Sequence, residues 1–297
     1  MSSNFSSSLE RAILETLAYS DVFDYPLKLD ELHRYLTYPA TKEEIMNCLN
    51  SSLSVSSNSN FYFLPKRDPL VDIRCERKTL SLPAFRRAIL YGRILGMFPF
   101  VRMVSMTGSL AVLNLSKDAD MDYMFVTQPS RLWLARSFAV TFGRIMRLFG
   151  DRICVNLLVA ESVLEWRPQD LYSAREMCQM IPITGVDVYQ RLRGVNSWID
   201  TYLPNAKSVP ENTPKIHSNQ SWIQKLLELP LRGKLGDAIE KWAMDFQIKK
   251  ITNTYGLGQE AKFSTELCQG NFDNHHFWTN QSFQERLAFL EENALHD

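Results

Sequence analysis

The sequence predicts an α+β protein built around a small mixed sheet. Three short apolar segments rich in branched residues, at 101–106, 121–127 and 153–160, have the length and composition of buried strands. Longer segments around them carry apolar residues at intervals of three or four, the period of an amphipathic helix. Helix-rich segments in front of and behind this strand-containing core complete the prediction of an α+β fold.

Composition indicates an ordinary globular chain. Of its 297 residues 45% are hydrophobic, and 33 basic residues balance 33 acidic ones, so no overall field draws the chain to nucleic acid or membrane. The five cysteines form no C-x-x-C pair, and arginines interrupt the longest apolar stretch, 132–150. We expect a cytoplasmic protein with no signal peptide and no membrane association.

The N-terminal segment, which we bound at 1–80, predicts a small helical domain with a hairpin. Amphipathic helices are expected at 8–20, 29–36 and 41–50, and an aromatic strand at 60–65. This order is typical of a winged-helix domain. The third helix carries one Lys against two Glu, whereas phosphate contacts need Lys or Arg. We therefore expect a structural or protein-binding module and no DNA binding.

The segment 101–127 is the one around which the chain is organised. A buried strand ends before Gly108, whose freedom suits a turn that approaches a ligand closely, and Ser109 is a favoured N-cap for the short helix that follows. The next strand is entered through Asp118, Asp120 and Asp122. The last two are two positions apart, so their carboxylates lie on one face of an extended chain, where a Mg²⁺ ion would relieve their repulsion.

The Gly108-Ser109 pair, the spacer 110–119 and the Asp120-Met121-Asp122 triplet together resemble the signature of the DNA polymerase β-type nucleotidyltransferases. The resemblance implies a nucleotidyltransferase core, which we bound at 81–165. It implies that the Gly-Ser turn holds a nucleoside triphosphate. It also implies that Asp120 and Asp122 bind one or two Mg²⁺ ions for in-line attack on the α-phosphate.

Basic residues near this motif are candidate phosphate ligands. Lys117 lies in the loop before the aspartates, and Arg131 and Arg136 lie near the start of a long helix expected at 131–150, which Gly150 ends. Another helix, at 82–97, is expected to lead into the first strand.

The third strand departs from the family pattern. Active members carry a third carboxylate there, whereas alternation along 153–160 makes Asn156 the polar residue in the matching place. Asn cannot accept the proton of an attacking hydroxyl, although it can hydrogen-bond or ligate Mg²⁺ weakly. Three possibilities stay open: a carboxylate relocated to Asp151 or Glu161, a slow enzyme with two carboxylates, or a nucleotide-binding protein without catalysis.

The C-terminal region, which we bound at 166–297, is expected to be helical. The phrases LYSARE and WIDTYLPN resemble a little-studied group of nucleotidyltransferase-domain proteins that also carry a winged-helix-like N-terminus. His275 and His276 are adjacent and therefore point different ways, which disfavours joint metal ligation. A linker is expected at 204–219. Helices are expected at 170–180, 186–203, 221–229 and 236–253.

These features predict transfer of a nucleoside monophosphate from a triphosphate to a hydroxyl of RNA, protein or a small molecule. The predicted catalytic residues are Asp120, Asp122 and Asn156. Three alternatives stay open: a nucleotide-binding module that lacks chemistry because position 156 is Asn, a DNA-binding regulator acting through residues 8–65, and a toxin-like or antitoxin-like transferase that modifies RNA or protein. The sequence does not indicate the base, the acceptor or the oligomeric state.

Overall fold

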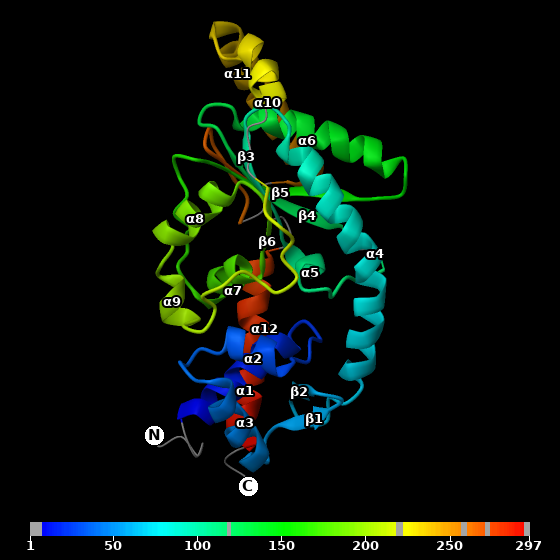
Figure 1. Ribbon diagram of the computed structural model, residues 1–297, viewed down its shortest axis with the longest axis vertical. Helices are drawn as coiled ribbons and strands as arrows, with labels where there is room; N and C mark the ends of the chain where they lie inside the picture. Colours follow the sequence, from blue (N-terminus) through cyan, green and yellow to red (C-terminus); the bar gives the residue numbers. More distant parts are fainter. Residues whose placement is uncertain (1–7, 118–119, 218–221, 257–259, 271–273, 294–297) are drawn as a thin grey trace.

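The computed structural model describes residues 8–117, 120–217, 222–256, 260–270 and 274–293, and the fold is α+β. Its described residues form twelve α-helices, a six-stranded mixed sheet and a two-stranded hairpin. The molecule is elongated, with the N-terminal helices and hairpin at one end and the large sheet towards the other (Figure 1). No helix among the described residues is both long enough and apolar enough to cross a bilayer.

The N-terminal unit has the predicted order of helices and hairpin. The Thr41 hydroxyl accepts a hydrogen bond from the Glu44 amide at 3.2 Å, which caps the third helix as its sequence predicts. An isolated antiparallel bridge between Leu27 and Tyr62 joins the segment before α2 to the hairpin. The elements are α1 (Ser8–Asp21), α2 (Leu29–Tyr35), α3 (Lys42–Ser51), β1 (Ser56–Asn58) and β2 (Phe61–Phe63).

The three predicted strands lie next to one another in the centre of the large sheet. They are β3 (Val101–Met106), β4 (Met121–Thr127) and β5 (Ile153–Ala160), and their bounds are the predicted ones. The strand order is β6-β3-β4-β5-β8-β7; β3 pairs antiparallel with β4, and β4 pairs parallel with β5.

The expectation of a purely helical C-terminal region was incomplete, because three strands of the sheet come from it. They are β6 (Ile181–Thr184), β7 (Lys262–Phe263) and β8 (Leu267–Gln269). Two to four residues are too few to show a strand period, and β6 contains Pro182, which is tolerated because β6 is an edge strand.

The helices around the sheet follow the predicted pattern with two differences. The helix expected at 82–97 begins at Leu70 and has Pro83 in its interior, and the single helix expected at 186–203 is two helices. The buried Asn196 lies between these two and bonds to the Leu164 carbonyl at 2.7 Å and the Trp166 amide at 2.8 Å. The remaining elements are α4 (Leu70–Gly96), α5 (Gly108–Ala111), α6 (Leu132–Arg147), α7 (Leu171–Gln179), α8 (Val186–Val195), α9 (Ile199–Tyr202), α10 (Trp222–Glu228), a 3-10 turn (Leu229–Leu231), α11 (Lys234–Tyr255) and α12 (His275–Asn293).

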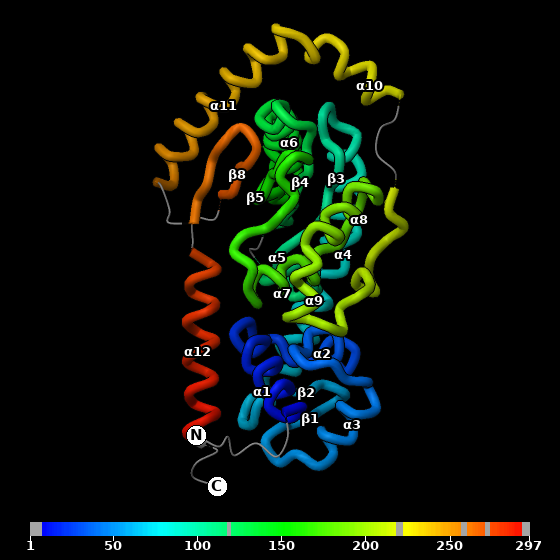
Figure 2. Tube along the Cα trace, turned by 90° about the vertical axis from the view of Figure 1, so that its left-hand side faces the viewer, coloured from blue at the N-terminus to red at the C-terminus, as the bar shows by residue number. Residues whose placement is uncertain are grey.

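Two hydrophobic cores lie on opposite faces of the sheet. One contains Tyr123 and Phe125 of β4 with residues of α4 and α6. The other contains Met124 and Val126 of β4 together with residues of α7, α8 and the N-terminal helices. The N-terminal unit therefore shares a core with the sheet. Helix α12 runs from the sheet back along α1, so both ends of the described chain meet in this unit (Figure 2).

Candidate functional site

The turn after β3 and the carboxylate of Asp122 lie directly against each other. Gly108 has φ +66°, and a Cβ placed on it would lie 2.5 Å from Asp122 Oδ2, so both conformation and space require glycine. The Thr107 amide donates to the Asp122 carbonyl at 2.9 Å, and the Asn114 amide donates to the Ser109 carbonyl at 2.8 Å. The predicted Gly-Ser turn and the predicted aspartate strand therefore form one local unit.

The neighbours of Asp122 are acidic or neutral. The pKa of Asp122 is raised to about 6, chiefly by burial; the charge of Asp120 contributes to the rise, and a hydrogen bond from the Cys154 thiol opposes it. No basic side chain is among the groups that set this pKa. Asp120 is partly buried at the entrance to β4. Two interacting carboxylates without a cationic partner are an arrangement that a divalent cation would stabilise.

The residue beside Asp122 on β5 is Cys154. The parallel register pairs these two residues, and the pKa of the Cys154 thiol is raised by burial and by the Asp122 charge. Asn156, which we expected in this place, lies where the β4–β5 register shifts, and its carbonyl accepts from the Gly270 amide at 3.2 Å. Cys154, and not Asn156, is therefore the residue directly beside Asp122, although the side chains of Cys154 and Asn156 line the same cavity.

The two acidic residues that flank β5 have other partners. Asp151 forms an ion pair with Arg87 at 2.8 Å and accepts from the Tyr91 hydroxyl at 2.7 Å, and these contacts lower its pKa against the effect of burial. Glu161 forms an ion pair with Arg191. Neither residue lines the cavity that contains Asp122, so neither replaces the missing carboxylate.

Sequence reasoning missed Glu176, a carboxylate that faces the same cavity from α7. The Glu176 carboxylate has no hydrogen-bond or ion-pair partner in the part of the chain that the structure describes, and burial together with the Asp122 charge raises its pKa to about 7. A glutamate inside a helix is ordinary in sequence, so no local signal marks it. Its significance arises only from the position of α7 over the Asp122 face of the sheet.

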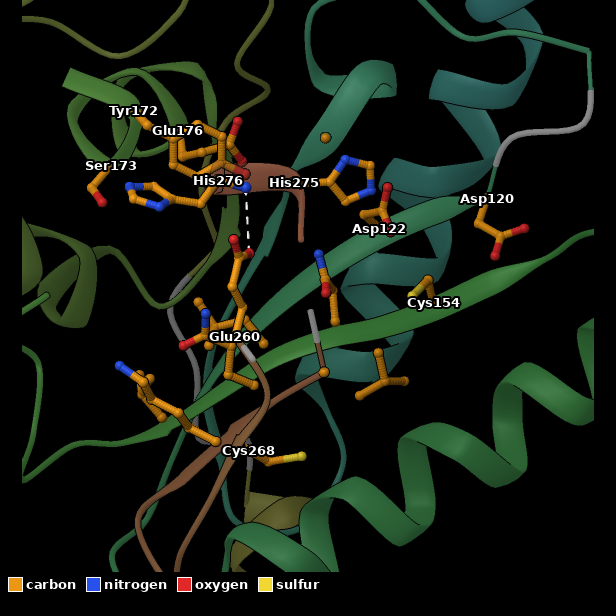
Figure 3. Close-up of a pocket in the computed structure, with 18 of the residues that line it drawn as sticks. Asp120, Asp122, Cys154, Tyr172, Ser173, Glu176, Glu260, Cys268, His275 and His276 are labelled. Atoms are coloured by element: carbon orange, nitrogen blue, oxygen red, sulfur yellow. Dashed lines mark hydrogen bonds between the residues drawn. The ribbon is translucent and has the colours of Figure 1, made fainter. Parts of the chain in front are cut away.

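The residues of this site line a cavity of about 1480 Å³. Figure 3 shows Asp120 just before β4, Asp122 on β4, Cys154 on β5, Glu176 on α7 and the two histidines at the start of α12 around this space. The cavity brings together six of the eight sequence-predicted site residues: Gly108, Ser109, Asp120, Asp122, Arg136 and Asn156.

Two predicted phosphate ligands lie elsewhere. Arg131 is buried and donates to the Leu231 and Arg232 carbonyls at 3.0 and 3.1 Å, and it pairs with Asp237 at 2.7 Å. It therefore fixes the segment between α10 and α11, which corrects its assignment to the nucleotide. Lys117 is exposed and does not line the cavity. Asp118, which the sequence also singled out, lies outside the described residues.

Arg136 lies on the cavity wall and is partly engaged. One nitrogen donates to Gln247 Oε1 at 2.6 Å, while its Nε is buried without a hydrogen-bond partner. Burial raises the pKa values of the Cys154 and Cys268 thiols, and the positive charge of Arg136 opposes that rise. Of the three predicted cations it is the one that lines the cavity.

The two histidines have different surroundings, as their adjacency predicts. His276 Nε2 lies 2.5 Å from Asp170 Oδ2, and its ring centroid is 4.9 Å from that of Tyr172. Glu260 caps α12 by accepting from the His276 amide at 3.3 Å and the Phe277 amide at 2.9 Å (Figure 3). His276 is thereby tied to α7, whereas His275 is exposed on the cavity wall.

The described residues contain no group of three or more His, Cys, Asp and Glu side chains arranged to hold a metal ion. A cation at Asp120 and Asp122 would therefore need further ligands from a substrate. Comparison of this chain with protein-family models, with curated proteins and with solved structures gives no match.

Proposed function

We propose that this protein is a nucleotidyltransferase with a DNA polymerase β-type core, which transfers a nucleoside monophosphate from a triphosphate to a hydroxyl acceptor and releases pyrophosphate. One observation supports this reading above all others. The Asp122 carboxylate lies against the glycine turn, within 2.5 Å of where a Cβ of Gly108 would be. Glycine allows the turn to approach the carboxylate this closely, so the turn and both aspartates line one cavity, and that cavity could hold a cation and a phosphate chain.

Asp120 and Asp122 fit a Mg²⁺ ion that arrives with the nucleotide. Mg²⁺ is commonly held by one or two carboxylates together with substrate phosphates, and the raised pKa of Asp122 reflects a buried charge without a counter-ion. The ion, when bound, would neutralise charge on the phosphates. The Gly108 turn and Ser109 would hold the β- and γ-phosphates, and Arg136 would add a positive charge at the same wall.

Glu176 is the side chain best suited to receive the acceptor proton. It lines the cavity without a partner, and its pKa of about 7 matches a base that works near neutral pH. In the proposed step the acceptor hydroxyl gives its proton to this carboxylate and its oxygen attacks the α-phosphorus. The bond from that phosphorus to the bridging oxygen breaks, and pyrophosphate leaves. Most of the rate would come from positioning and charge neutralisation.

The experiment that tests the proposal follows label from each α-labelled nucleoside triphosphate with Mg²⁺, with and without cell extract. We expect label transfer and pyrophosphate release by the wild-type protein, and loss of both by orders of magnitude in Asp122→Asn. Asp187→Asn is the matched control, because Asp187 is exposed on α8 and outside the cavity. Transfer that survives in both Asp120→Asn and Asp122→Asn would contradict the assignment.

A second function, nucleotide binding without transfer, is favoured by the neutral Cys154 beside Asp122. In this reading the protein would bind a Mg²⁺-nucleotide and respond to it. Calorimetry with ATP and Mg²⁺ beside the pyrophosphate assay separates the two: binding without release supports the second function.

We propose that residues 8–63 form a winged-helix-like unit whose role is structural. Support comes from the element order, the Leu27–Tyr62 bridge and the core shared with the sheet. Lys42 on α3 is paired with Asp30, and Glu43 and Glu44 follow it, so this helix offers little to DNA phosphates. A gel shift that weakens with salt would instead favour a DNA-binding regulator.

A further inference from the structure

The segment formed by α10, the following turn and α11 buries several polar side chains and exposes several large apolar ones, although Ala243 and Ile251 of α11 also lie in the hydrophobic core. Gln224 and Glu228 are each 1% exposed, whereas Trp222 is 74% exposed and Trp242 is 65% exposed. A helix on the surface of a globular protein normally places its apolar stripe against the core. Here a large part of the apolar surface faces outwards while amides and carboxylates face inwards.

The inner side of this segment is held by buried polar contacts. The Gln224 side chain donates to the Phe98 and Val101 carbonyls, each at 2.8 Å. Glu228 accepts from the Phe100 amide at 2.9 Å and pairs with Arg102 at 2.8 Å. In α11, Glu240 accepts at 2.8 Å from the amides of Trp133 and Leu134, which satisfies the first turn of α6. The orientation of the segment is therefore fixed by specific bonds and is part of the fold.

The outer side carries a group of large apolar side chains that we call the α10–α11 outer surface. The rings of Trp242 and Phe246 stack at 5.5 Å with an interplanar angle of 9°. The segment arches over the end of the molecule opposite the N-terminal helices (Figure 2). Large exposed apolar patches on soluble proteins commonly mark sites that contact a protein or a membrane. The members of the surface are Trp222, Ile223, Leu226, Leu227, Leu229, Leu235, Trp242 and Phe246.

Unpaired positive charges accompany this surface. Lys225, Lys234 and Lys241 are exposed and form no ion pair within the described part of the chain. The acidic residues of the segment have partners on its inner side, apart from the exposed Asp245: Glu228 pairs with Arg102 and Arg232, Asp237 with Arg131, and Glu240 with backbone amides. The outward charge of this segment is therefore positive although the chain as a whole is neutral.

We propose that the α10–α11 outer surface binds the headgroup region of a membrane that contains anionic lipids, which departs from the expectation of no membrane association that overall composition gave. Tryptophan, phenylalanine and leucine side chains enter the boundary between headgroups and acyl chains, and lysines beside them reach lipid phosphates. A second copy of the chain fits less well. A two-fold contact would bring the same patch against itself and set lysine against lysine. The inference does not rest on the proposed chemistry, since binding to lipid needs no turnover.

The test measures co-sedimentation of the full chain with vesicles of equimolar phosphatidylglycerol and phosphatidylcholine. Trp242→Ser with Phe246→Ser should weaken binding at least tenfold, because both rings would otherwise enter the boundary region. Both side chains are already more than half exposed, so the fold does not depend on them. The matched control is Leu148→Ser with Phe149→Ser, which removes side chains that are 84% and 75% exposed after α6 and should leave binding unchanged.

The contribution of the lysines to lipid binding is tested by replacing Lys225, Lys234 and Lys241 with Gln. Each lysine near an anionic surface contributes about fivefold to affinity, so the triple variant should bind about a hundredfold more weakly. Its matched control replaces three exposed cations outside this surface, Lys78, Arg86 and Lys207.

Three results would overturn the proposal. The first is no binding of the wild-type protein to anionic vesicles, or equal binding to purely zwitterionic ones. The second is equal loss in the variants and their controls. The third is a wild-type dimer in light scattering that the Trp242/Phe246 variant dissociates, which would assign the surface to a second copy.

Discussion

Replacing Glu176 with Gln should stabilise the protein at alkaline pH and leave its stability unchanged under acid conditions. The pKa of Glu176 is raised from 4.5 to about 7, chiefly by burial and then by the Asp122 charge. In the unfolded chain the carboxyl ionises near pH 4.5, whereas in the folded protein it keeps its proton up to about pH 7. The folded state therefore binds more protons between these values, and stability falls as pH rises through this window.

The size of the effect follows from the width of that window. At 1.36 kcal/mol per pH unit, a pKa raised from 4.5 to about 7 corresponds to about 3 kcal/mol above pH 7. Because the side chain faces a cavity and is partly exposed, we expect between about 1 and 3 kcal/mol in practice. Gln keeps the shape and removes the charge, so the variant should lack this part of the pH dependence.

Urea unfolding of wild type and variant, at about pH 4.5 and about pH 8, measures the difference. Glu43→Gln is the matched control, since Glu43 is exposed on α3 and outside the cavity. The reasoning would be refuted by a variant that is less stable than wild type at pH 8, or by a gain of the same size at both pH values. A carboxylate that lowers stability and faces a cavity is typical of a functional site, where activity and stability compete.

Three further predictions concern the turn, the metal and the corrected arginine. Gly108→Ala should cost about 1 to 3 kcal/mol in urea unfolding, because of φ +66° and the clash with Asp122, whereas Gly194→Ala, at a glycine with open space around its Cα, should not. Calorimetry should detect Mg²⁺ binding only when a nucleoside triphosphate is present, since two carboxylates are an incomplete ligand set; tight binding of Mg²⁺ alone would contradict this. Arg131→Gln should expose α10–α11 to limited proteolysis and cost about 2 kcal/mol or more, while nucleotide affinity stays within twofold; a large loss of affinity would return Arg131 to the phosphate site.

The central strands and the glycine–aspartate unit could be predicted because their signals are local. A run such as 101–106 is apolar enough to be buried on both faces, and Gly108 and Asp122 are joined by one short helix and one loop. The residue beside Asp122 depends on where β5 starts relative to β4. Alternation made residues 154 and 156 equivalent, and the register shift near Tyr123 decides in favour of Cys154.

The remaining errors share a different cause, which is contact between residues far apart in sequence. Arg131 near a helix start is equally compatible with a phosphate and with a bond to Asp237, more than a hundred residues away. Glu176 becomes relevant only when α7 packs over the sheet. In α10, Gln224 and Glu228 face inwards because the Phe98 carbonyl and Arg102 bind them, and both of these partners lie more than a hundred residues away in sequence.

The return of α12 to the N-terminal helices has a mechanical consequence. A helix of 19 residues is a rod about 28 Å long, and this one starts with two histidines at the cavity wall and continues along α1. Arg286 in its last part is bonded to Asp21 at 2.7 Å, and the same aspartate holds Arg67. Rotating the N-terminal helices as a body would thus carry the histidine end of the rod along, which couples the position of these helices to one wall of the cavity.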